Sequence, residues 1–129
     1  MLARAAALVF GLCLPTTPAL AMSIELYQQL ADAPEARHSG LIVRNIYLRS
    51  LYEMLLYVIV LQEQRGQRPL FCPPEHGSRL SDAALDALMR ARFVRQTAYH
   101  SPAERLKIAR ETPAELVLIE VLQEEFPCR

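Results

Sequence analysis

Residues that start and stop helices divide most of this chain, and they constrain its fold more than any other feature. Segments 101–104 (Ser-Pro-Ala-Glu) and 112–115 (Thr-Pro-Ala-Glu) each place a capping residue before Pro, with Glu three positions after the cap. In this capping box the hydroxyl and the carboxylate bind backbone N–H groups that a helix start leaves free, and Pro suits the first helical position. Because Pro113 would cost about 3 kcal/mol inside a helix, we expect Thr112 to cap a new helix.

Three further helices are predicted upstream, each bounded by residues that stop or cap a helix. They span residues 23–33, residues 39–64 and the segment that Ser81 caps. A Pro-rich loop over 67–79 precedes the third helix. No stretch alternates between apolar and polar residues over the length of a strand, so we predict little or no sheet.

The long helix over 39–64 is predicted to lie at the centre of the fold. Asn45, Arg49 and Glu53 recur at four-residue spacing as one polar stripe, and residues 54–61 are then all apolar. A helix that is apolar all round is enclosed by other helices or by lipid, and this run is shorter than the roughly 20 residues that span a bilayer. We therefore expect an all-α fold, a small helical bundle of about five helices around this central apolar helix.

The first 21 residues have the pattern of a cleavable export signal. A basic residue is followed by an apolar run over 5–14, and residues 19–21 (Ala-Leu-Ala) supply the small side chains that a signal peptidase requires. We expect cleavage after Ala21. Residues 1–21 would then be the signal peptide, and residues 22–129 would form a single helical domain in the periplasm.

Export also determines the expected state of the cysteines. Cys13 would leave with the signal peptide, and Cys72 and Cys128 would remain as one pair in an oxidising compartment. Their disulfide would close a loop of about 57 residues, which the chain-entropy model values at roughly 4 kcal/mol. The alternative is a free, reactive Cys72 beside His76, which would make the protein a thiol enzyme.

The sequence contains no assembled set of catalytic or metal-binding groups. Its three histidines lie in separate segments, and Cys72 with His76 supplies only half of a zinc site. Four glycines in the chain leave no phosphate-binding loop. Fourteen basic and fourteen acidic residues cancel, so no nucleic acid is expected as a partner. We predict no enzymatic activity, no cofactor, no metal, and no membrane contact after signal cleavage.

Several motifs around the two cysteines occur in a distinctive order. Residues 70–74 (Leu-Phe-Cys-Pro-Pro) are followed by a polar turn, a helix opened at Ser81, and a closing segment 126–128 (Phe-Pro-Cys). In this order they resemble the Rap/Tai family, which are immunity proteins for peptidoglycan amidase effectors of the type VI secretion system. The resemblance covers residues 67–128, and the long helix shares only the family's general character. The segment between Arg92 and Thr112 is longer here than in the family.

The resemblance implies a periplasmic protein that binds an incoming peptidoglycan amidase effector and occludes its catalytic cleft. Such a role requires a rigid scaffold with a projecting contact surface, and the extra segment 96–104 is our candidate. The predicted partner-binding residues are Arg92, Arg95, Gln96, Tyr99, His100 and Glu104, with Tyr99 as the anchor.

Besides the thiol enzyme, two alternatives to this interpretation stay open. The segment 96–104 could be a solvated connector that binds nothing. The protein could be an acid-stress chaperone, because small periplasmic helical proteins with one disulfide also serve that role. A homodimer is a further assembly that the sequence allows.

Overall fold

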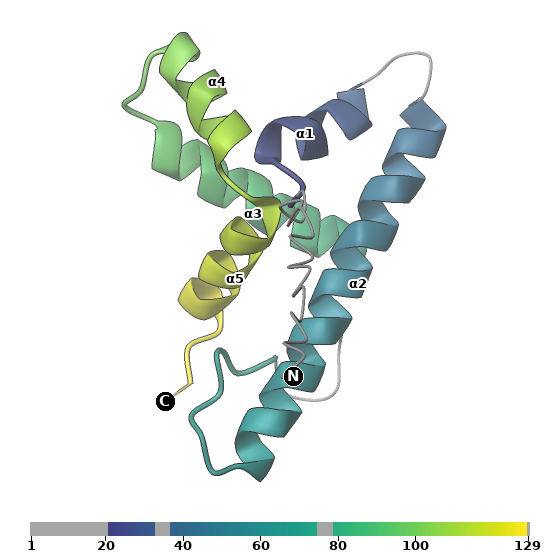
Figure 1. The fold of residues 1–129 in the computed structure, drawn as a ribbon, viewed down its shortest axis with the longest axis vertical. Coiled ribbons are helices and arrows are strands. Elements are labelled where there is room, and N and C mark those ends of the chain that lie inside the picture. The colour runs from purple at the N-terminus through teal and green to yellow at the C-terminus, as the bar shows by residue number, and fades with distance from the viewer. Residues whose placement is uncertain (1–20, 33–36, 75–78, 129) are drawn as a thin grey trace, which may run out of the picture.

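The computed structural model describes residues 21–32, 37–74 and 79–128 (Figure 1). These residues contain five helices. They are α1 (Ile24–Asp32), α2 (Arg37–Gln64), α3 (Asp82–Thr97), α4 (Pro102–Glu111) and α5 (Ala114–Glu125). Helix α1 packs against α2 and α4, and α3 packs against α2 and α5. No strand occurs in the described residues, so the predicted all-α bundle of five helices is confirmed.

The hydrophobic core combines side chains from all five helices and from the loop after α2. The inner face of α5 is fully enclosed, since Ala114, Val117, Leu118, Val121 and Leu122 are each 0% exposed. Their spacing is that of a single apolar helix face. The other large, fully buried side chains are Ile24, Tyr27, Leu48, Tyr52, Phe71, Leu85 and Met89.

Helix α2 is enclosed on one side only, so the expectation that residues 54–61 are buried all round is wrong. Three of them are exposed: Met54 at 55%, Tyr57 at 65% and Val60 at 46%. The predicted polar stripe instead meets α3, because Arg49 Nη2 lies 2.6 Å from Asp82 Oδ1 at the start of that helix. The side of α2 that neighbouring helices cover is apolar, with Leu48, Tyr52, Leu55 and Ile59 buried. Arg49 lies beside this face and is partly exposed, and other apolar residues are left facing solvent.

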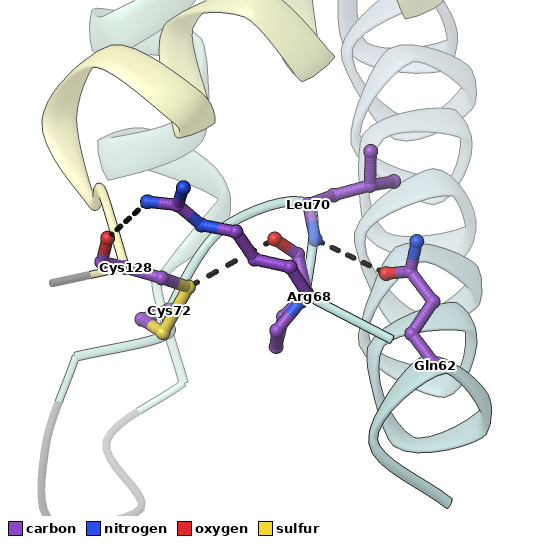
Figure 2. The surroundings of a disulfide bond; sticks show 6 residues. Gln62, Arg68, Leu70, Cys72 and Cys128 are labelled. Atoms are coloured by element: carbon purple, nitrogen blue, oxygen red, sulfur yellow. Dashed lines mark hydrogen bonds between the residues drawn. A yellow bond between two sulfur atoms is a disulfide. The ribbon is translucent and has the colours of Figure 1, made fainter. Parts of the chain in front are cut away.

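A disulfide between Cys72 and Cys128 ties the loop after α2 to the end of α5, as predicted (Figure 2). The Arg68 guanidinium donates a hydrogen bond to the Cys128 carbonyl at 2.8 Å. The Leu70 N–H donates to the Gln62 side-chain oxygen at 3.1 Å. The loop is thereby attached both to the last turns of α2 and to the segment that follows α5.

The starts of α3 and α4 confirm the predicted caps, whereas the start of α5 does not. Ser81 Oγ accepts the Ala84 N–H at 3.1 Å, and Ser101 forms the complete capping box with its Glu three residues later. Helices α4 and α5 are separate, as predicted. However, Thr112 lies at the end of α4, Pro113 occupies the N-cap position of α5, and no side chain caps this helix.

Backbone pairing replaces the missing cap at the start of α5. The Ala114 N–H donates to the Met22 carbonyl at 2.8 Å, and the Ile24 N–H donates to the Thr112 carbonyl at 3.0 Å. These bonds form an isolated antiparallel bridge, which we call the N-terminal bridge. One of the N–H groups that a helix start leaves free is thus bonded to a distant part of the chain, and the Thr112 hydroxyl is not needed.

The two capping-box motifs of the sequence should therefore respond differently to loss of their hydroxyl, because only the first forms a capping box in the structure. Ser101→Ala is expected to lower the free energy of unfolding by about 1 kcal/mol, because the Glu104 N–H loses its acceptor. Thr112→Ala is expected to lower it by less than about 0.5 kcal/mol, because Thr112 contributes to the N-terminal bridge through its backbone. Urea titrations of both variants measure the difference. Equal losses would contradict the assignment of the α5 start.

Candidate functional site

The connection between α3 and α4 presents the most exposed aromatic side chain among the described residues. We call residues 96–104 the α3–α4 corner. Tyr99 lies in it and is 100% exposed. A tyrosine carries a large apolar area with a polar end, and it is enriched at protein interfaces for that reason. An aromatic side chain that contributes nothing to the core is a candidate contact for another molecule.

The end of α3 holds the first part of the corner in place. Thr97 is only 2% exposed, and its hydroxyl donates a hydrogen bond to the Phe93 carbonyl at 2.9 Å. The His100 N–H donates to the Thr97 carbonyl at 3.1 Å. The backbone on both sides of Tyr99 is therefore fixed to a buried residue.

The start of α4 holds the second part. The Ser101 N–H and hydroxyl both donate to Glu104 Oε2, at 2.8 Å and 2.7 Å. These bonds lower the pKa of the exposed Glu104 carboxyl. Arg105 Nε donates to the His100 carbonyl at 2.9 Å. A corner that is ordered before binding loses less conformational entropy when a partner arrives.

Two arginines attach this end of α3 to α5. Arg92 lies 3.1 Å from Glu120 and 3.2 Å from Glu124. Arg95 lies 3.4 Å from Glu124 and 3.8 Å from Glu125. The arginines predicted to contact a partner are therefore paired within the chain, and they support the position of α3.

The six predicted partner-binding residues thus fall into two groups. Gln96, Tyr99 and His100 are exposed, and they are the ones that offer new contacts. Arg92, Arg95 and Glu104 are bonded within the chain. The sequence reasoning missed Val94, which is 66% exposed on α3. Val94 does not share the helix face of the buried residues Leu85, Met89 and Phe93, and this position in the sequence could have identified it as exposed.

A second group of polar side chains gathers around Asp86 and joins α1, α2 and α3. The Tyr27 hydroxyl donates to Asp86 Oδ1, and Arg44 Nη1 lies 3.4 Å from the same oxygen. Arg90 Nε donates to Asp86 Oδ2 at 2.9 Å. The Arg44 guanidinium also lies 5.6 Å from the centre of the Tyr27 ring, within the range of a cation–π contact.

Burial is the first cause that raises the pKa of the Tyr27 phenol, and the hydrogen bond to Asp86 is the second. The phenol therefore stays protonated and remains a donor. Asp86 and Arg90 form an ion pair at the edge of this largely buried cluster. Because the Asp86 carboxylate contacts Tyr27, Arg44 and Arg90 from three helices, we assign the cluster to the stability of the bundle, although the buried Arg44 Nε has no hydrogen-bond partner.

The described residues were also compared with the requirements of a metal site and of a membrane-spanning helix, and they meet neither. They contain no group of three or more His, Cys, Asp or Glu that could hold a metal ion, and none of their helices is long and apolar enough to cross a membrane. A hollow of about 320 Å³ beside the disulfide is lined by Arg68, Pro69, Leu70, Gln123, Pro127 and Cys128.

The predicted signal peptide, apart from Ala21, and His76 lie outside the described residues.

Comparisons with protein-family models, with curated proteins and with solved structures found no match for this chain.

Proposed function

We propose that this chain is a periplasmic immunity protein that binds a type VI secretion peptidoglycan amidase effector and occludes its catalytic cleft. The α3–α4 corner is the proposed contact, and Tyr99 is its anchor. The observation that carries the proposal is the complete exposure of Tyr99 on a corner whose backbone is held from both sides. The class of partner is inferred from the order of the motifs around the two cysteines, which resembles that of the Rap/Tai family.

The physical requirements of an occluding inhibitor agree with this corner. Interface anchors are aromatic or arginine side chains that enter a pocket of the partner, and a fully exposed tyrosine can do so without leaving a hole in its own core. Gln96 and His100 flank the anchor with groups that can form hydrogen bonds. An inhibitor of this kind acts by binding alone, so it needs no catalytic group of its own.

Tyr99→Ala is expected to weaken binding to the amidase by about 2 kcal/mol or more, which is about 30-fold in Kd. The melting temperature should not change, because the Tyr99 side chain contacts no core residue. The measurement is calorimetry with a purified type VI secretion peptidoglycan amidase effector. Tyr57→Ala is the matched control, since Tyr57 is also exposed but lies on α2, and it should leave the Kd unchanged.

The role itself is tested in cells by directing the same amidase to the periplasm, with and without this protein. Protection from lysis is the expected result. Lysis in both cases, with no complex on gel filtration, would reject the immunity function for that pair and favour the acid-stress chaperone. Protection that Tyr99→Ala leaves intact would keep the function and remove the α3–α4 corner as its contact.

A further inference from the structure

The disulfide lies at the surface of the molecule, next to the hollow of about 320 Å³ described above. Cys72 is exposed and Cys128 is half-buried. Cys128 is one of the residues that line the hollow, whereas Cys72 is not. Disulfides that another thiol can reach are the ones that take part in exchange. We call this surface the disulfide hollow, and its residues are Arg68, Pro69, Leu70, Gln123, Pro127 and Cys128.

The disulfide hollow combines one cation with an apolar wall. Figure 2 shows the Arg68 guanidinium beside Cys128, to whose carbonyl it donates a hydrogen bond at 2.8 Å. A guanidinium carries five N–H donors, so it can hold this carbonyl and attract an anion as well. Pro69, Leu70 and Pro127 supply the apolar wall. The reactive form of a thiol is the thiolate, which a nearby cation favours. The hollow therefore suits a partner that presents a thiolate.

The two cysteines are held differently by the rest of the fold. The Cys72 N–H donates to the Phe126 carbonyl at 2.8 Å, and the neighbouring Phe71 is only 1% exposed. Cys128 instead follows the last residue of α5 by three positions. A partner bonded to Cys128 can move away from the bundle with the end of the chain, whereas a partner bonded to Cys72 has to stay against the core. Cys128 is therefore the better position for a mixed disulfide.

The short distance between the two cysteines favours a partner with two thiols. Their Cα atoms are 5.0 Å apart in the bridge, so a Cys72 thiolate released by the attack stays close to Cys128. It can attack the mixed disulfide and expel the partner. A partner that has a second thiol of its own competes with this reversal, because its second attack is also intramolecular. A small monothiol lacks this route.

We propose that the disulfide hollow is the docking site of a thiol–disulfide oxidoreductase with two active-site cysteines, and that Cys128 is the cysteine that bonds to it. The hollow lies at the ends of α2 and α5, away from the residues of the α3–α4 corner. The proposal therefore does not depend on the immunity function, and Tyr99→Ala should leave the exchange unchanged.

The exchange moves two electrons in two steps. The partner's first thiolate attacks Cys128 Sγ and forms a new S–S bond, while the Cys72–Cys128 bond breaks and Cys72 leaves as a thiolate that takes a proton from water. The partner's second thiolate then attacks the partner's first sulfur and releases Cys128. Once protonated, Cys128 can donate to the Pro69 carbonyl, whose oxygen lies 4.0 Å from its sulfur. The reverse sequence closes the bridge and reduces the partner's disulfide.

The first test identifies the cysteine that bonds to the partner. Oxidised protein is mixed with an excess of thioredoxin that keeps only the first of its two active-site cysteines, and free thiols are then alkylated in acid. Mass spectrometry should find thioredoxin linked to Cys128 and the alkyl group on Cys72, at least about tenfold more often than the reverse. The rate of linkage should be the same with and without 1 M urea, since the folded protein reacts.

The second test changes the charge of the hollow and uses intact, reduced thioredoxin. Gln123→Glu should slow reduction of the bridge about fivefold, because the new carboxylate repels the incoming thiolate. Gln29→Glu is the matched control, since Gln29 is equally exposed but lies on α1, and its rate should equal that of wild type. Arg68→Ala should also slow the reaction. If Arg68 only anchored the end of the chain, its loss would speed the reaction. Circular dichroism verifies that the variants fold.

Each other outcome overturns the proposal. Linkage at Cys72 rejects the assignment of Cys128. No linkage to thioredoxin, with 2-mercaptoethanol opening the bridge freely, means that the hollow admits no protein. A bridge that neither reagent opens is not an exchange site. A rate that rises with urea shows attack on the unfolded chain, and equal rates for Gln123→Glu and wild type remove the hollow from the path.

Discussion

Removal of the Cys72–Cys128 disulfide is expected to lower the free energy of unfolding by about 4 kcal/mol. The two cysteines are separated by 56 positions, so the bond excludes a large set of open conformations from the unfolded chain. Domains of this size have a total stability of about 5–15 kcal/mol. The measurement is urea denaturation of the Cys72→Ala/Cys128→Ala variant against wild type, at neutral pH without reductant.

Two comparisons separate the covalent bond from its surroundings. Arg68→Ala removes the hydrogen bond to the Cys128 carbonyl but keeps the disulfide, and it should cost no more than about 1 kcal/mol. Wild type in reductant should match the double variant. If the protein isolated from cells carried two free thiols and lost nothing on substitution, the stabilising role would be rejected and the thiol-enzyme alternative would return.

Asp86→Ala is expected to cost about 3–5 kcal/mol of folding stability, because it leaves the Arg44 cation largely buried without its counter-charge. The Arg44 and Asp86 side chains are only 10% and 16% exposed. The substitution also removes the acceptor of the Tyr27 hydroxyl. Thermal and urea unfolding measure the loss.

Asp82→Ala is the matched control, since Asp82 and its partner Arg49 are each 35% exposed. It should cost less than about 1 kcal/mol, as partly solvated ion pairs do. Replacing Tyr27, Arg44 and Asp86 together with Phe, Met and Leu should recover most of the stability, because no buried charge remains. A small loss for Asp86→Ala alone would show that water reaches the cluster.

Features that depend on a few neighbouring residues were predictable from the sequence. The hydroxyls of Ser81 and Ser101 bind N–H groups only three residues away, so the caps of α3 and α4 are local. The period of apolar residues identified the inner face of α5. The disulfide followed from the number of cysteines rather than from any contact.

Features that depend on distant partners were not predictable. Asp86 accepts a hydrogen bond from Tyr27, 59 positions away, and nothing near Asp86 in the sequence indicates this. Thr112 resembles a cap, but residues before α1 already bond the backbone around it. In α2 the apolar run has no polar position that marks a solvent side, so its exposed face depended on where the other helices pack.

The same limit applies to the α3–α4 corner. Its position between two helices was predictable, and so was its capping box. The complete exposure of Tyr99 was not, because it depends on how the described helices are arranged in space, and none of them covers the corner. The pairing of Arg92 and Arg95 with α5 also required the three-dimensional arrangement.

The N-terminal bridge and the disulfide have a consequence for the order in which this chain can fold during its synthesis. The ribosome makes residues 22–24 early, but their bonding partners at 112–114 come about 90 positions later. Cys72 likewise has to wait for Cys128. Loop-closing contacts of such high separation form late, so a nascent chain still lacking its last residues cannot complete either closure. Until its last residues are made, the growing polypeptide therefore lacks both the link that joins its first helix to the start of α5 and the link that joins the loop after α2 to the end of α5.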